Sequence, residues 1–246
     1  MKTNTVARDF AVPFAVAAVG GLGALPGARS GADPVALLAW ISIWSATAGF
    51  LCASGGVRRL AFLALPPAAW MGLAAVVDGA SPRDLPSAAW AALAWSGLFA
   101  GGFGLGRMSR PSSGLAGASV VFLIAFLLAA LPILPGRAGA PPSPAVEARL
   151  LDLSPATLVE ECAGIDWMRH PAIYDAAGSA DIDPSLRLPY RGRLAGPIAF
   201  VVGCLVAAIG EGIARARAKR PPSIVNADSE TSAWPSTSTS APSHRT

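Results

Sequence analysis

Six long apolar windows constrain the fold of this chain more than any other feature of its sequence. They cover residues 10–28, 35–53, 60–77, 88–106, 115–134 and 194–214. A helix needs about 20 mainly apolar residues to cross the hydrocarbon core of a bilayer, and a backbone in lipid must satisfy its own hydrogen bonds. The windows therefore predict an all-α fold: a polytopic integral membrane protein with about six transmembrane helices.

The composition agrees with this prediction and argues against several other classes of protein. Charged residues make up 14% of the 246 residues, whereas soluble domains carry roughly 25%. The Lys and Arg residues lie between the windows and form no patch interleaved with aromatic residues, so we expect no nucleic-acid partner. The three cysteines, Cys52, Cys162 and Cys204, show no CxxC spacing and predict neither a disulfide framework nor a zinc site.

Basic residues beside the windows predict which side of the membrane each connection occupies. They gather at the start of the chain, in alternate connections and after the last window; the residues concerned are Lys2, Arg8, Arg58, Arg59, Arg107, Arg110, Arg215, Arg217, Lys219 and Arg220. Because basic residues favour the cytoplasmic side, both termini should be cytoplasmic. The preference for Ala, Gly, Pro and Arg over Lys is typical of a GC-rich bacterial genome, so we predict a multi-pass protein of the bacterial cytoplasmic (inner) membrane.

The two ends of the chain carry further predictions. Residues 1–32 combine a basic start, an apolar run and small residues, so a cleaved signal peptide is the alternative to a first span. After the sixth window, residues 215–246 begin with basic side chains and continue with Ser, Thr and Pro. The second part, residues 221–246, has too little apolar content to fold, and we predict that the tail is first basic and then disordered in the cytoplasm.

The connection of residues 136–193 is the only long one, and the predicted orientation places it outside the cytoplasm. Its first part is Pro-rich, and we expect it to be extended. Ser154 followed by Pro155 then predicts the start of a helix, and Pro171 its end, because the residue before a proline avoids the helical conformation. We therefore expect a helix over about residues 155–169.

This expected helix is amphipathic. Leu158, Cys162 and Ile165 recur at helical spacing and form one apolar stripe, with Trp167 near its end. Tryptophan favours the boundary between membrane and water. We expect the helix to lie on the outer membrane surface or to pack over the ends of the spans.

The same stretch also raises the hypothesis of a metal or catalytic site. Cys162, Asp166 and His170 follow one another at four-residue steps and could face one way on a helix, and all three are zinc ligands in other proteins. However, His170 precedes Pro171 and no fourth ligand is apparent, so we expect no bound metal or other cofactor. A catalytic pair of Cys162 and His170 would need a third group to orient it, which the sequence does not indicate.

The interiors of the windows contain almost no ionisable side chains and no histidine. Ion-coupled transporters and proton relays place such groups inside the membrane. The chain also lacks a GxxxxGK phosphate-binding loop. We therefore expect a non-enzymatic membrane protein that does not drive transport by itself. Gly102 and Gly106 have the spacing of helix-packing glycines and predict close contact between helices.

Only the layout of the chain resembles a known class of proteins. Six spans, cytoplasmic termini and a helix-bearing outer loop between the fifth and sixth spans look like the membrane half of ABC exporters of the ABC-2 type. The resemblance is one of architecture, and it implies the membrane component of a transport complex in the lipid bilayer, with a separate ATPase subunit as partner. Two other hypotheses stay open: a membrane-anchored enzyme or metal-binding protein that uses residues 136–193, and a membrane scaffold or assembly factor.

Overall fold

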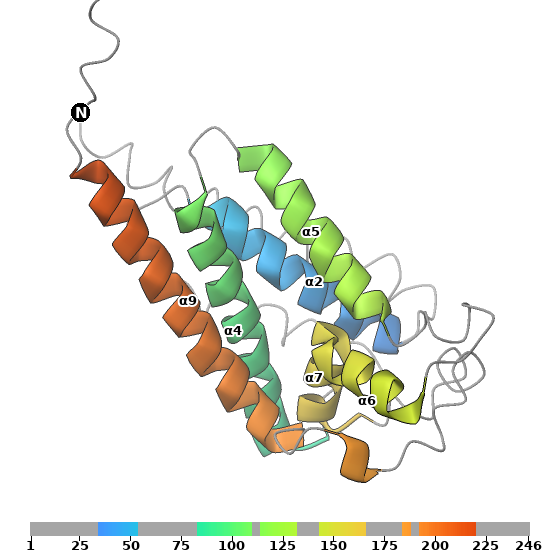
Figure 1. The fold of residues 1–246 in the computed structure, drawn as a ribbon. Helices are drawn as coiled ribbons and strands as arrows, with labels where there is room; N and C mark the ends of the chain where they lie inside the picture. Colours follow the sequence, from blue (N-terminus) through green and yellow to red (C-terminus); the bar gives the residue numbers. More distant parts are fainter. Residues whose placement is uncertain are drawn as a thin grey trace, which may run out of the picture.

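The computed structural model describes residues 34–53, 83–109, 114–131, 143–165, 184–187 and 192–219. In these residues the regular structure consists of six α-helices and two short 3-10 helices, without strands (Figure 1). The all-α prediction is therefore confirmed for the part of the chain that the structure describes.

Four long helices fall on four of the six apolar windows. They are α2 (Pro34–Cys52), α4 (Leu85–Met108), α5 (Gly114–Ala130) and α9 (Ala195–Ala218). By length and apolar composition, α4 and α9 can each cross a membrane, whereas the apolar stretches of α2 and α5 are shorter. The windows at 10–28 and 60–77 lie outside the described residues. Within the described residues the structure thus supplies two helices able to span a membrane, and it does not show six.

Local sequence signals explain where the long helices begin and end. α4 starts at Leu85 because the carboxylate of Asp84 accepts a hydrogen bond from the Ser87 N–H at 2.8 Å, and Pro86 occupies the first turn. α5 ends at Ala130, sooner than the predicted window, because Pro132 disfavours the helical conformation of the residue before it.

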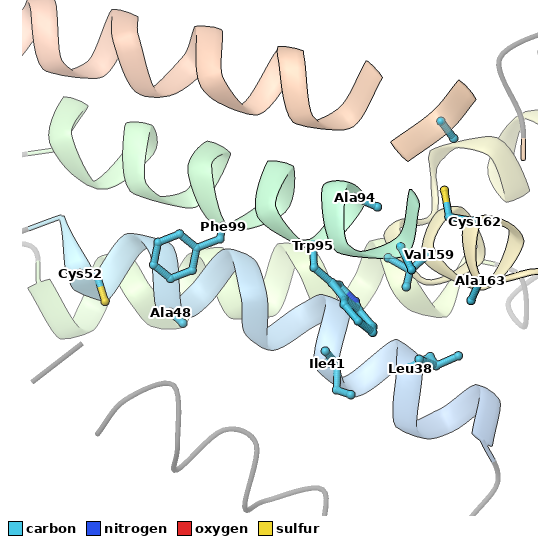
Figure 2. Close-up of a cluster of buried hydrophobic side chains, with 12 residues drawn as sticks. Leu38, Ile41, Ala48, Cys52, Ala94, Trp95, Phe99, Val159, Cys162 and Ala163 are labelled. Atoms are coloured by element: carbon cyan, nitrogen blue, oxygen red, sulfur yellow. The ribbon is translucent and has the colours of Figure 1, made fainter. Parts of the chain in front are cut away.

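The long helices lie side by side in the order α9, α4, α2 and α5, as Figure 1 shows. α4 is therefore an inner helix, and its Trp95, Phe99 and Phe103 side chains are almost fully buried. Figure 2 shows Trp95 beside Leu38 and Ile41 of α2, in the largest cluster of buried apolar side chains. The core of the bundle thus lies between α2 and α4.

Glycines pack α4 against α9 along the length of both helices. The contacts come from Gly97 and Gly104 on α4 and from Gly196, Gly203 and Gly210 on α9. Seven residues nearly complete two turns, so each set lies on one face of its helix. A Cβ at Gly203 would overlap the carbonyl of Gly97, and a Cβ at Gly210 would overlap that of Gly104. Because the residue numbers rise together, the two helices are parallel, and we call this contact the glycine seam.

A second pair of glycines packs the other side of α4 against α2. A Cβ at Gly102 would overlap the carbonyl of Ala46, and a Cβ at Gly106 would meet the side chain of Ala53. The close helix contact that the spacing of these two glycines predicts is therefore confirmed. The residue numbers again rise together, so α2 is parallel to α4.

α5 runs in the opposite direction on the outer side of α2. Gly117, near the start of α5, lies against the ring of Phe50 near the end of α2. Phe122, further along α5, packs edge-on against Trp40, with 6.0 Å between ring centroids. The residue numbers therefore run against each other, and α5 returns toward the end of the bundle where α2 and α4 begin.

Four short helices form a cap over that end of the bundle (Figure 1). They are α6 (Pro144–Leu153), α7 (Pro155–Ala163), η6 (Pro184–Leu186) and η7 (Gly192–Leu194). We use the name cap for residues 143–165, 184–187 and 192–194. Val159 and Cys162 of α7 join the core cluster between α2 and α4, as Figure 2 shows. The cap is thus continuous with the core of the bundle.

The first helix of the cap was not predicted from the sequence. The extended start expected for the long connection falls mainly on residues 136–142, outside the described residues, and the chain is helical from Pro144. Ser143 at the N-cap position and Pro144 in the first turn form the same kind of helix start that marks α7. The buried side chains of Ala148 and Leu151 pack against Val35 at the start of α2. Burial against the bundle therefore stabilises α6, which the proline content of this segment makes hard to predict.

The second helix of the cap begins at Pro155, as predicted, but ends at Ala163 instead of near residue 169. Gly164 adopts a left-handed conformation with φ of 76° and donates to the carbonyl of Glu161 at 3.1 Å. The N–H of Ile165 donates to the carbonyl of Glu160 at 3.0 Å, which completes a Schellman ending. α7 lies over the ends of α2 and α4, and Trp167 lies outside the described residues.

Candidate functional sites at the two ends of the bundle

Two networks of charged side chains hold α9, one near each of its ends. The cap network centres on Arg187, which follows η6. Its Nε donates to Oδ1 of Asp152 and its Nη2 donates to Oε1 of Glu161, both at 2.6 Å. The side chains of Arg187 and Asp152 are only 5% and 2% exposed. One buried guanidinium therefore joins α6, α7 and the segment that leads toward α9.

Glu161 and its neighbour extend this network to the start of α9. The second oxygen of Glu161 accepts a hydrogen bond from the N–H of Gly192 at 3.2 Å. The thiol of Cys162 donates to the carbonyl of the same glycine at 3.4 Å. Gly192 has φ of 69°, a conformation that favours glycine. α7 thus holds both backbone groups of the residue from which η7 and then α9 begin.

The electrostatics of the cap network favour a permanently charged Arg187. Burial lowers the pKa of Arg187, but Glu161 and Asp152 raise it by more, so the pKa lies above its ordinary value. A buried ion pair recovers its desolvation cost only when its geometry and hydrogen bonds are good. The two short charge-assisted bonds meet that condition. The network is therefore well suited to holding the cap together.

A further carboxyl of the cap is buried without such a partner. Glu147 is in the first turn of α6 and is 7% exposed. Among the described residues, no group donates a hydrogen bond to its Oε1. Burial raises the pKa of the Glu147 carboxyl, because the charged form is disfavoured away from water. This side chain opposes the stability of the cap at neutral pH.

The position of Cys162 bears on the sequence hypotheses for this stretch. Burial and the charge of Glu161 raise the pKa of its thiol to about 12, against a smaller opposing effect of the Gly196 backbone. Cysteine attacks as the thiolate, so this environment suits a structural thiol better than a nucleophile. Asp166 and His170 lie outside the described residues, so the metal triad and the catalytic pair stay untested hypotheses. Within the described residues, no three His, Cys, Asp or Glu side chains could hold a metal ion.

The second network lies at the other end of α4 and α9. Nε of Arg107 donates to one oxygen of Glu211 at 2.9 Å, and Nε of Arg215 donates to the other at 3.1 Å. Arg107 also donates to the carbonyl of Ala53, after α2, at 3.3 Å. The carboxylate of Glu211 therefore links α4 to α9, and Arg107 also reaches the end of α2.

Arg217 adds a contact between the same helix ends. Its Nη1 donates to the carbonyls of Met108 and Ser109, at the end of α4. The unsatisfied carbonyls of a helix end carry partial negative charge, so a cation there is favourable. Arg217 also continues the seven-residue series of Gly203 and Gly210 on the seam face of α9. Lys219 is exposed at the C-cap of α9.

The structure describes half of the basic residues that the sequence assigns to the cytoplasmic side beside the later windows. Arg107, Arg215, Arg217 and Lys219 meet at one end of the bundle. The others, Arg58, Arg59, Arg110 and Arg220, lie outside the described residues. The cap network was not predicted from sequence, because its partners are 26 and 35 residues apart in the chain and follow no helical spacing.

Comparisons with protein-family models, with curated proteins and with solved structures find no match for this chain. The geometry of the bundle and of its two charged networks is therefore the basis for any assignment of function.

Proposed function

We propose that this protein is a non-enzymatic, multi-pass subunit of a complex in the bacterial cytoplasmic membrane, and that the complex carries out transport. The observation that carries the proposal is the division of α9 into two faces. Its glycine face packs on α4, while its opposite face exposes large aliphatic side chains. These are Ile198, Val201, Val202, Leu205 and Ile209, with exposed fractions between 41% and 57%.

Exposed aliphatic side chains on this scale favour a lipid environment. Soluble monomers rarely leave a contiguous apolar patch of such large side chains in water. α5 supports the same conclusion, because Val120, Leu123, Ile124, Phe126 and Leu127 are also about half exposed. The inner helix α4 carries the small residues and the buried aromatic side chains. This arrangement suits a helical bundle whose outer helices contact acyl chains.

The helix directions support the predicted topology. If all six windows cross the membrane, the second, fourth and sixth spans run one way and the fifth runs the other. α2, α4 and α9 are parallel and α5 is antiparallel to α2. The basic residues Arg107, Arg215 and Arg217 then lie on the cytoplasmic side, and the cap lies on the opposite side.

The described charges favour a subunit over a self-sufficient transporter or an enzyme. Arg187, Asp152 and Glu161 are engaged with one another, and Cys162 has a raised pKa. A conformational cycle that moves a substrate uphill needs an energy source that distinguishes two states. We infer that a partner, such as a separate ATPase subunit, supplies it and binds the cytoplasmic end of the bundle.

A pair of labelling sites tests the membrane part of the proposal. In a variant whose native cysteines are replaced by serine, Ala145→Cys in the cap and Lys219→Cys after α9 place one thiol at each end. In intact inverted and right-side-out vesicles, a membrane-impermeant maleimide should label the two positions from opposite sides. Labelling of both from the same side, or release of the wild-type protein from membranes by alkaline carbonate, would contradict the proposal.

The partner is tested by gentle purification from native membranes. We expect a second chain, an ATPase, to co-purify in a fixed ratio, and substitution of Arg58 and Arg59 to weaken its association. Purified protein that performs uphill transport in liposomes without any other chain would overturn the assignment as a dependent subunit.

A further inference from the structure

The end of α9 joins an aliphatic face to a basic one. Among the described residues, this end of the bundle carries one carboxylate, Glu211, which binds Arg107 and Arg215. It also carries two further cations, Arg217 and Lys219. Four cations against one carboxylate leave a formal charge of +3. This charge is uncompensated by the described part of the chain, so it is available to an anionic ligand.

Two of the cations, Arg215 and Lys219, lie at the C-terminal end of the outward face of α9. The backbone of Lys219 is still helical, with φ of −84° and ψ of −13°. Lys219 follows Val201 by 18 residues, which is five turns of about 3.6 residues, so both lie at the same angle around the helix. Arg215 is one turn before Lys219, on an adjacent position. Its side chain is 63% exposed although its Nε is bound to Glu211.

The surface between the aliphatic and basic parts is open. Gly212 lies about one turn beyond Ile209 on the outward face, and no atom would lie within 4 Å of a Cβ placed there. At about 1.5 Å per residue, Arg215 is roughly 9 Å beyond Ile209 along the helix axis. That separation matches the step from acyl chains to headgroups in a bilayer, and a long arginine side chain can bridge the rest of it.

We propose that the C-terminal end of α9 binds an anionic phospholipid. The acyl chain lies along Val201, Leu205 and Ile209, and the phosphate lies between Arg215 and Lys219. Arg107 and Arg217 add positive charge from the side of α4, while Glu211 fixes the direction of Arg215. This inference rests on the proposed membrane location, because it requires α9 to face lipid.

Lipid retention by the purified full-length chain tests the site. Phosphatidylglycerol is titrated into the protein in phosphatidylcholine-containing detergent micelles, and bound lipid is counted by native mass spectrometry. A basic residue near an anionic surface contributes about a five-fold factor in binding, so Arg215→Gln with Lys219→Gln should weaken retention roughly 25-fold. The control variant is Arg149→Gln, which removes an exposed charge from the cap. It should retain as much phosphatidylglycerol as the wild-type protein does.

Two further arms identify the source of the bound phosphate. Glu211→Gln removes the competing negative charge and keeps a side-chain oxygen that can accept a hydrogen bond from Arg215. Retention of phosphatidylglycerol should therefore strengthen, whereas a merely structural network would show no gain. Inorganic phosphate at equal ionic strength should not displace the lipid. Equal retention by wild type and the double variant, or displacement by inorganic phosphate, would overturn the inference. A chain that stays soluble without detergent would instead contradict the membrane location, so the two failures are distinguishable.

Discussion

The two ends of α9 are held by the same chemistry in different surroundings. In the cap, Arg187 and Asp152 are 5% and 2% exposed, so their charges are almost fully withdrawn from water. At the other end, Arg215 is 63% exposed and shares its carboxylate with Arg107. A buried pair becomes costly when one partner is lost, whereas an exposed pair contributes little. We therefore expect the cap network to contribute more to the stability of the protein than the exposed pair of Arg215 and Glu211 does.

The largest expected effect comes from removing the buried cation of the cap. Arg187→Met removes the buried cation that Asp152 and Glu161 share, and the free energy of unfolding should fall by about 3–5 kcal/mol. Thermal or denaturant unfolding in detergent measures it. Arg149→Met, the control, removes an arginine that is 54% exposed and 3.9 Å from Asp152, and should cost less than about 1 kcal/mol. Equal losses in the two variants would contradict the contrast between buried and exposed pairs.

A substitution in the glycine seam should weaken the packing of α9 against α4. Gly203→Ala forces the backbones of α9 and α4 apart, because its Cβ would overlap the carbonyl of Gly97. We expect a loss of about 1–3 kcal/mol of unfolding free energy. Gly212→Ala is the control on the same helix, and it meets open space. It should raise stability by up to about 1 kcal/mol through helix propensity. If both substitutions stabilise the protein, α9 and α4 cannot be in close backbone contact at Gly203.

The cap should respond to pH through Glu147. Its raised pKa means that the folded state binds the proton more tightly than the unfolded state, whose pKa is near 4.5. The cost of the buried charge is therefore absent below pH 4.5 and complete once the pH exceeds the folded-state pKa. Glu147→Gln should stabilise the protein at pH 8, and the gain should vanish as the pH falls below 4.5. A gain that does not depend on pH would point to a cause other than ionisation.

The smallest expected effect belongs to the exposed end. Arg215→Gln should change the free energy of unfolding by less than about 1 kcal/mol, because solvent screens the pair and Arg107 still neutralises Glu211. The same unfolding measurement as for Arg187→Met gives a direct comparison. A loss as large as that of Arg187→Met would show that the two networks play equal structural parts.

The long helices are predictable from the sequence because their apolar signal is continuous and local. The windows at 88–106 and 194–214 coincide with α4 and α9 within a few residues, and the Ser-Pro pair gave the start of α7. The end of α7 was wrong because Gly164 stops the helix before Pro171 does. α6 was missed because the prolines before it hid a second Ser-Pro start at Ser143.

The charged networks could not be found in this way. Arg187 reaches two carboxylates on different helices, and nothing in the spacing of these residues indicates that the cap brings them together. Arg107 and Arg215 were predicted as residues of the cytoplasmic side, and that prediction stands as part of the proposed topology. Their shared carboxylate, Glu211, emerges only from the parallel packing of α4 and α9.

The parallel packing of α4 and α9 also sets an order of events during synthesis. Met108 precedes Ala195 by 87 residues, and a ribosome adds roughly 5–20 residues per second. α4 is therefore complete about 4–17 s before α9 emerges to cover Gly97 and Gly104. In that interval the glycine face of α4 is not yet covered by α9. Among the described helices, α9 is thus the last to be made, and its arrival closes the bundle on the side of α4.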